Sequence, residues 1–110
     1  MEIFYKTKKL EKTLTNDVKM AKKYGALARH LKKRMKQLKA SPNLATVNKI
    51  PQLKLHKLDN NRKDEWSIEI LKNDSLTFKI VDDPIPMLPN GSHDFEKITT
   101  IVIVFVGDYH

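Results

Sequence analysis

The chain has 110 residues, with 21 Lys and Arg against 13 Asp and Glu, and it contains no cysteine. This length supports one domain with a single modest core, and the lack of cysteine excludes a disulfide framework and a thiolate metal site. The formal net charge of +8 favours a polyanionic partner, either nucleic acid or an acidic protein. The first residues lack the basic-then-apolar order of a signal peptide, so we expect a cytoplasmic protein with no membrane contact.

The first half of the sequence predicts helices after a short edge strand at residues 3–5. A helix is expected at residues 7–15, and Asn16 is a typical N-cap for a longer one. Apolar residues then recur every three or four positions and form one stripe: Met20, Tyr24, Leu27, Leu31, Met35 and Leu38. Gly25 costs this helix about 1 kcal/mol without necessarily ending it.

The other side of the long helix is basic, and no acidic residue occurs between positions 18 and 39. Such a surface is either an ordinary solvated face or a footprint for a nucleic acid backbone. Ser41 and Pro42 next predict the start of a short helix that ends before Pro51.

The second half of the sequence changes to a period of two, which is typical of strands. Strands are predicted at residues 53–58, 66–70 and 75–80, with a hairpin turn at residues 73–75. A loop with three prolines covers residues 82–97, and the apolar run at residues 101–106 predicts a strand that is buried on both faces. The predicted fold is therefore α+β, with an N-terminal helical hairpin packed on one face of a mainly antiparallel sheet. The other face is left for a ligand.

Few residues outside the predicted core can carry chemistry. His56 is expected on the open face of the sheet, and Asp108, Tyr109 and His110 follow the last strand at its rim. The alternatives are that His56 is an ordinary surface histidine and that residues 108–110 are a frayed chain end. His30 and His93 are expected to be exposed bystanders. No phosphate-binding glycine loop, metal-spaced cluster or Ser-His-Asp signature is present.

Basic residues combined with histidines could cleave RNA without a metal. A base removes the proton of a ribose 2′-hydroxyl, cations stabilise the phosphorus oxygens, and an acid protonates the leaving oxygen.

Three segments of the sequence also carry a resemblance to a known family. They are LHKLDNNRKDEWSIEI at residues 55–70, LTFKI at residues 76–80 and the final DYH. Together with the MEIFYK start and the basic helices, they resemble HigB-type toxins of the RelE/ParE superfamily, which are the toxin halves of bacterial type II toxin–antitoxin systems. The similarity extends over nearly the whole chain.

The resemblance implies one RelE-like domain over residues 1–110 and a ribosome-dependent endoribonuclease that cuts translated mRNA. It implies no cofactor and no metal, and a HigA-like helix-turn-helix antitoxin that inhibits the toxin and brings it to operator DNA. By the resemblance, His56 and His110 transfer protons, Tyr109 orients or stacks the nucleotide, and Asp108 orients a histidine. Phosphate contacts are assigned to Lys54, Lys57, Arg62 and Lys79.

Two positions depart from the family pattern. Asp59 stands where these toxins often have a lysine, and Ser75 stands where they usually have an arginine. Either Lys57 and Lys79 replace the lost cations, or the chain is a weak nuclease. The departures also keep open a ParE-like poison that binds DNA gyrase without cutting RNA, and a basic RNA-binding module without toxicity.

Overall fold

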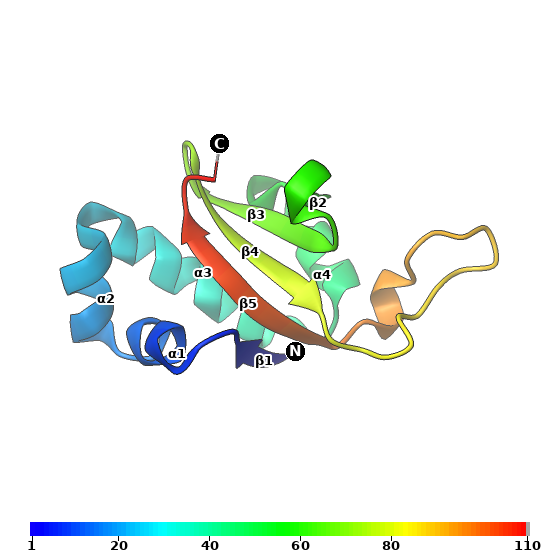
Figure 1. Ribbon diagram of the computed structural model, residues 1–110, viewed down its shortest axis with the longest axis horizontal. Coiled ribbons are helices and arrows are strands. Elements are labelled where there is room, and N and C mark those ends of the chain that lie inside the picture. Colours follow the sequence, from blue (N-terminus) through cyan, green and yellow to red (C-terminus); the bar gives the residue numbers. More distant parts are fainter. Residues whose placement is uncertain (110) are drawn as a thin grey trace.

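The computed structural model describes residues 1–109, apart from the side chain of Asn60, as an α+β fold with a five-stranded mixed sheet. The strand order is β1-β5-β4-β3-β2 (Figure 1). The strands are β1 (Glu2–Tyr5), β2 (His56–Lys57), β3 (Glu65–Leu71), β4 (Asp74–Ile80) and β5 (Thr100–Gly107). β1 pairs in parallel with β5, and the three other pairs are antiparallel. The predicted first edge strand and the mainly antiparallel sheet are therefore confirmed.

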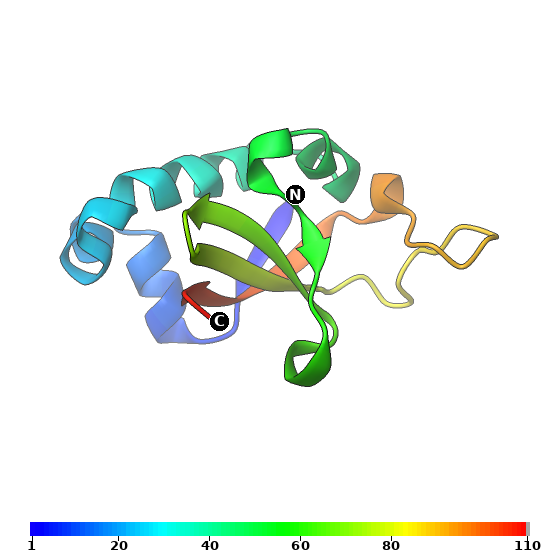
Figure 2. The same cartoon turned by 90° about the horizontal axis from the view of Figure 1, so that it is seen from above.

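The helices follow β1 in the chain, so the fold opens with a strand. They are α1 (Lys8–Leu14), α2 (Asp17–Tyr24), α3 (Ala28–Ala40) and α4 (Leu44–Asn48). Short 3₁₀ helices lie at η1 (Gly25–Leu27), η2 (Pro51–Leu53), η3 (Asn60–Arg62) and η4 (Phe95–Lys97). Figure 2 shows α3 and α4 along one face of the sheet and η3 beyond the other. We call the first side the core face and the second the outer face.

The prediction of one long helix after Asn16 is wrong, because the chain breaks at Gly25. Asn16 does cap α2, and its side chain accepts a hydrogen bond from the Lys19 N–H at 3.0 Å. Gly25, however, has φ +56° and ψ −126°, a conformation that glycine alone adopts without strain. The apolar stripe survives the break, and Met20, Leu31, Met35 and Leu38 are all buried.

Ser41 is not the N-cap that the sequence predicts. Asn43 caps α4, and its Oδ1 accepts a hydrogen bond from the Thr46 N–H at 3.0 Å. The Ser41 hydroxyl instead donates to the Gln37 carbonyl at 2.7 Å, where α3 ends. Both Ser41 and Asn43 are residue types that cap helices. Asn43 is the cap because it lies three positions before Thr46, whose N–H has no partner within the helix.

The strand predicted at residues 53–58 shrinks to His56–Lys57. Leu53 ends the 3₁₀ helix η2, and Lys54 has a left-handed φ of +48°, so the backbone is not extended there. The hairpin between β3 and β4 turns at Lys72 and Asn73, because Leu71 pairs with Asp74. It therefore lies slightly earlier in the chain than predicted.

One strand carries a bulge that decides which side chains reach which face. In β5, Ile103 pairs with Phe78 and Phe105 pairs with Thr77, so Val104 is an extra residue. Ile101, Ile103 and Val106 lie in the core, whereas Val104 and Phe105 are half-buried. The prediction of complete burial on both faces is therefore wrong for β5.

The predicted proline-rich loop extends away from the sheet in Figure 1. Within it, an isolated bridge joins Met87 to His93. In the described part of the chain, no helix has the length and apolar character needed to cross a membrane.

Candidate functional site

A row of four side chains crosses the outer face of the sheet. His56 of β2 lies opposite Ser67 of β3, Ser67 lies opposite Thr77 of β4, and Thr77 lies opposite Phe105 of β5. Residues directly opposite each other in a sheet point to the same face. We call these four residues the cross-sheet row. It joins the sequence-predicted His56 to three residues that the sequence did not single out.

Tyr109 reaches over this row from the end of β5. Its hydroxyl lies 3.4 Å from His56 Nε2 and 3.4 Å from Ser67 Oγ. The chain can turn there because Gly107 has φ +144°, and a Cβ at this position would lie 3.1 Å from Phe105 Cζ. Gly107 thus adopts a backbone angle that strains other residues, and a larger residue would crowd the Phe105 ring.

One contact defines the proton positions of the His56 ring. Its Nδ1 lies 2.8 Å from the Lys54 carbonyl oxygen. A carbonyl oxygen can only accept, so Nδ1 carries the hydrogen, and in the neutral ring Nε2 is the free base. This nitrogen is the atom that faces Tyr109. His56 is also exposed, so an incoming substrate can reach it.

Arg62 is a cation in contact with this cluster. Its guanidinium carbon lies 4.9 Å from the centre of the Phe105 ring and 5.6 Å from that of Tyr109. Nη1 donates a hydrogen bond to Glu65 Oε1 at 3.1 Å. Glu65 is buried, and the same oxygen accepts a hydrogen bond from Thr77 Oγ1 at 2.9 Å. Arg62 is therefore held in position by a carboxylate and two aromatic rings.

Lys54 contributes its backbone to the His56 contact and its ammonium group to a second ion pair. Its Nζ lies 3.6 Å from Glu69 Oε2, and the Lys54 side chain is largely exposed. An exposed pair of this kind is weak, so Lys54 can exchange Glu69 for a phosphate oxygen.

Lys57 and Lys79 point to different faces of the sheet. Lys57 pairs with Trp66, which belongs to the core, so it points to the other side of the sheet from His56. Together with Trp66, His93 and Lys79, it lines a separate cavity of about 250 Å³. Lys57 is therefore turned away from the cluster, whereas Lys79 lies opposite Glu65 on the outer face.

Four further positions were singled out from sequence: Asp108, His110, Asp59 and Ser75. Asp108 is exposed, and His110 lies outside the described residues. Asp59 accepts a backbone hydrogen bond from the Arg62 N–H at 3.3 Å. Ser75 is buried and lies opposite Gly107.

Neither His30 nor His93 is the exposed bystander that the sequence predicts, because both are half-buried. The His93 ring packs edge-on against Trp66 with 5.2 Å between the ring centres. Burial lowers the pKa of His93, and the nearby charge of Lys57 lowers it further.

Ser67, Thr77, Glu65 and Phe105 were missed from sequence, and for the two hydroxyl residues the reason is clear. The period of two assigns Ser67 and Thr77 to a solvent-facing side, but both are fully buried. The available signal was the pair of small hydroxyl residues on adjacent strands, which suits a polar layer covered by other side chains.

The cluster combines an accessible imidazole base, a tyrosine hydroxyl and a fixed guanidinium. These groups can move a proton and stabilise an anion. Among residues 1–109, no group of three or more His, Asp or Glu side chains is arranged to hold a metal ion.

No protein-family model matches this chain, and no curated protein shows significant similarity to it.

Proposed function

We propose that this chain is a HigB-type toxin of the RelE/ParE superfamily and that it cleaves translated mRNA at the His56 cluster. The observation that carries the proposal is the His56 ring, because its Nδ1 is held 2.8 Å from a carbonyl oxygen while its Nε2 faces Tyr109. An exposed imidazole with one nitrogen fixed as a donor and the other unprotonated is suited to general base catalysis.

In the proposed reaction, His56 Nε2 removes the proton from a ribose 2′-hydroxyl. The 2′-oxygen then forms a bond to the adjacent phosphorus, and the bond from phosphorus to the 5′-oxygen breaks. The products are a 2′,3′-cyclic phosphate and a 5′-hydroxyl end. His110 is assigned as the acid that protonates the leaving oxygen, and Asp108 orients a histidine.

Arg62 is the residue proposed to stabilise the charge on the phosphorus oxygens, with Lys54 as a second phosphate contact. Tyr109 supports the base through its hydroxyl and offers its ring for stacking on the nucleotide. Because Glu65 partly neutralises Arg62, and Asp59 and Ser75 supply no cation, we expect a slower nuclease than one with a full set of cations.

The proposal includes the biological setting of the family. The fold would be RelE-like, with β1 followed by a basic helical hairpin on one face of the sheet. The ribosome would present the mRNA, and a helix-turn-helix antitoxin would inhibit the toxin in the bacterial cytoplasm and carry it to operator DNA. Antitoxin binding should weaken with salt if the basic helices steer it.

The test is to express the chain alone in bacteria and to follow growth and mRNA integrity. The wild type should arrest growth and cut messages at codon-spaced positions. His56→Ala and His110→Ala should each abolish the cuts, whereas His30→Gln, on α3 outside the cluster, should not. Intact messages during arrest by the wild type would contradict the nuclease proposal.

One observation favours the alternative of a gyrase poison. Both Arg62 and Lys54 are paired with carboxylates, at 3.1 Å and 3.6 Å, which reduces the positive charge that a nuclease site needs. A supercoiling assay with purified gyrase separates the two functions. Inhibition at micromolar protein by both the wild type and His56→Ala would support the poison.

A further inference from the structure

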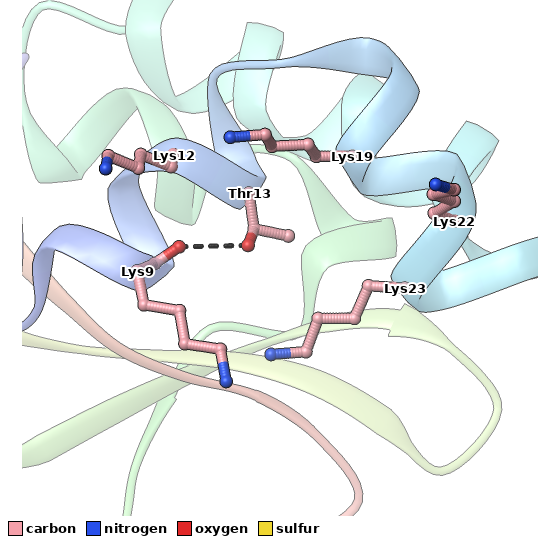
Figure 3. A pocket seen from close by; sticks show the side chains of 6 residues that line it. All are labelled: Lys9, Lys12, Thr13, Lys19, Lys22 and Lys23. Atoms are coloured by element: carbon pink, nitrogen blue, oxygen red, sulfur yellow. Dashed lines mark hydrogen bonds between the residues drawn. The ribbon is translucent and has the colours of Figure 1, made fainter.

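Five lysines surround an open cleft between α1 and α2. Figure 3 shows their side chains around it, with Thr13 at its wall. We call this the lysine cleft, and its volume is about 600 Å³. Its basic residues are Lys9, Lys12, Lys19, Lys22 and Lys23.

The cleft concentrates positive charge without internal compensation. No acidic residue lines it, and none of the ion pairs within residues 1–109 involves one of its lysines. Figure 3 shows the ammonium groups of Lys9 and Lys23 pointing toward each other. Like charges that converge in this way repel one another, so an anion between them would be stabilising.

A second cavity shares residues with both the lysine cleft and the cross-sheet row. Lys9 and Lys23 also line this cavity, which has a volume of about 230 Å³ and includes Tyr24 and Phe105 in its wall. Phe105 belongs to the cross-sheet row and packs against Arg62. A chain-like ligand that leaves the cluster past Phe105 would therefore meet Lys9 and Lys23 next.

From these shared residues we infer that the lysine cleft binds the phosphate backbone of a single-stranded RNA whose neighbouring segment occupies the His56 cluster. The inference rests on the proposed function, because that function places one segment of the RNA at the His56 cluster. The occupied surface would run from Arg62 past the two aromatic rings to the lysines. It makes the substrate an extended strand, longer than the nucleotides at the point of cleavage.

Two features favour RNA over an acidic protein. All the cations of the cleft are lysines, which act as point charges toward phosphates, whereas arginine is the residue suited to paired contacts with carboxylates. The connecting cavity also offers Tyr24 and Phe105, and alternating aromatic and basic side chains are typical of single-strand binding surfaces.

The test measures binding of fluorescent single-stranded RNA by anisotropy, with His56→Ala as the background so that no strand is cut. Two lengths are compared, a trinucleotide and a 12-nucleotide strand. A triple variant, Lys9→Gln with Lys19→Gln and Lys23→Gln, should weaken binding of the long strand at least tenfold and leave the trinucleotide unchanged. The slope of log affinity against log salt concentration for the long strand should become smaller by about 2, since each phosphate contact contributes roughly 0.7.

A charge-matched control carries Lys33→Gln, Lys49→Gln and Lys97→Gln, three exposed lysines outside the cleft. Circular dichroism checks that both triple variants are folded. Equal loss in the two triple variants would overturn the inference. Tighter, cleft-dependent binding of a ten-residue glutamate peptide than of the 12-nucleotide RNA would also overturn it, in favour of an acidic protein partner.

The two proposals can fail separately. If the wild type cuts no RNA but the cleft still binds the long strand, only the nuclease proposal fails. If the wild type cuts RNA and the cleft variant binds the long strand normally, only the cleft inference fails.

Discussion

Tyr109 depends on a single residue for its position over the sheet. Gly107 turns the chain at φ +144° beside the Phe105 ring, and the Tyr109 hydroxyl then reaches both His56 and Ser67. The backbone angle of Gly107 therefore sets where the Tyr109 side chain lies.

Gly107→Ala should reduce RNA cleavage by about tenfold or more, because the added Cβ would crowd Phe105 and the strained φ would cost roughly 1–3 kcal/mol. Cleavage of an mRNA in a reconstituted translation reaction measures the effect. Gly91→Ala is the matched control, since Gly91 has φ +89° with nothing within 4 Å. It should lose stability without losing activity, and equal activity losses in the two variants would contradict the role of Gly107.

Ser75 offers a test of the missing cation. It lies opposite Gly107 and Glu69 on the outer face, so Ser75→Arg would add a positive charge beside the Tyr109 turn. We expect cleavage to rise by about tenfold, because cations near the phosphorus oxygens stabilise the transition state. Ser75→Ala serves as the control for loss of the hydroxyl, and an unchanged rate in a folded Ser75→Arg protein would count against the phosphate site.

At the scale of the element, the break between α2 and α3 lets the two basic helices differ in role. α3 keeps its apolar side on the sheet, while α2 carries Lys19, Lys22 and Lys23 to the lysine cleft. The break requires a conformation that other residues adopt only with strain.

Gly25→Ala should destabilise the fold by about 1–3 kcal/mol, because its φ of +56° is strained for alanine even though no atom lies within 4 Å of the added Cβ. The thermal midpoint should fall by roughly 4–8 °C per kcal/mol, as measured by circular dichroism. Lys33→Ala, at an exposed site in α3, should change it little. A thermal midpoint for Gly25→Ala as high as that of the wild type would contradict the prediction that the break between α2 and α3 needs glycine.

At the scale of the whole molecule, the proline-rich loop is tied to the sheet through His93. Its ring lies against Trp66 and Phe95, with centres 5.2 Å and 6.5 Å away. Lys57, Lys79 and Asp64 are the charged residues that line the adjacent cavity.

Protonation of His93 should therefore loosen this contact at mildly acidic pH. Its pKa is lowered by burial and by Lys57, so the unfolded chain takes up the proton first. The stabilising effect of the neutral ring is complete above the unfolded pKa of about 6.5 and is lost as the pH falls toward the lower folded pKa. Thermal midpoints of the wild type and His93→Phe between pH 7.5 and 5 measure this, and the variant should be less sensitive to pH. His30→Gln is the control, and identical pH profiles for wild type and His93→Phe would contradict the prediction.

The sequence by itself determined the local features of this protein. The Asn16 cap, the apolar stripe from Met20 to Leu38, and the strands β3 to β5 follow from side-chain periodicity and capping, which act over a few residues. It also predicted His56, Tyr109 and Arg62 as members of one site, through their resemblance to a family.

Only the tertiary structure decided which residues complete that site. Ser67, Thr77 and Phe105 align with His56 because of strand register and the bulge at Val104, and neither is encoded within one strand alone. The lysine cleft forms from two helices whose relative placement depends on packing, and Lys57 leaves the cluster because it lies opposite Trp66. Long-range pairing and backbone angles at a few residues set these positions, so local patterns could not predict them.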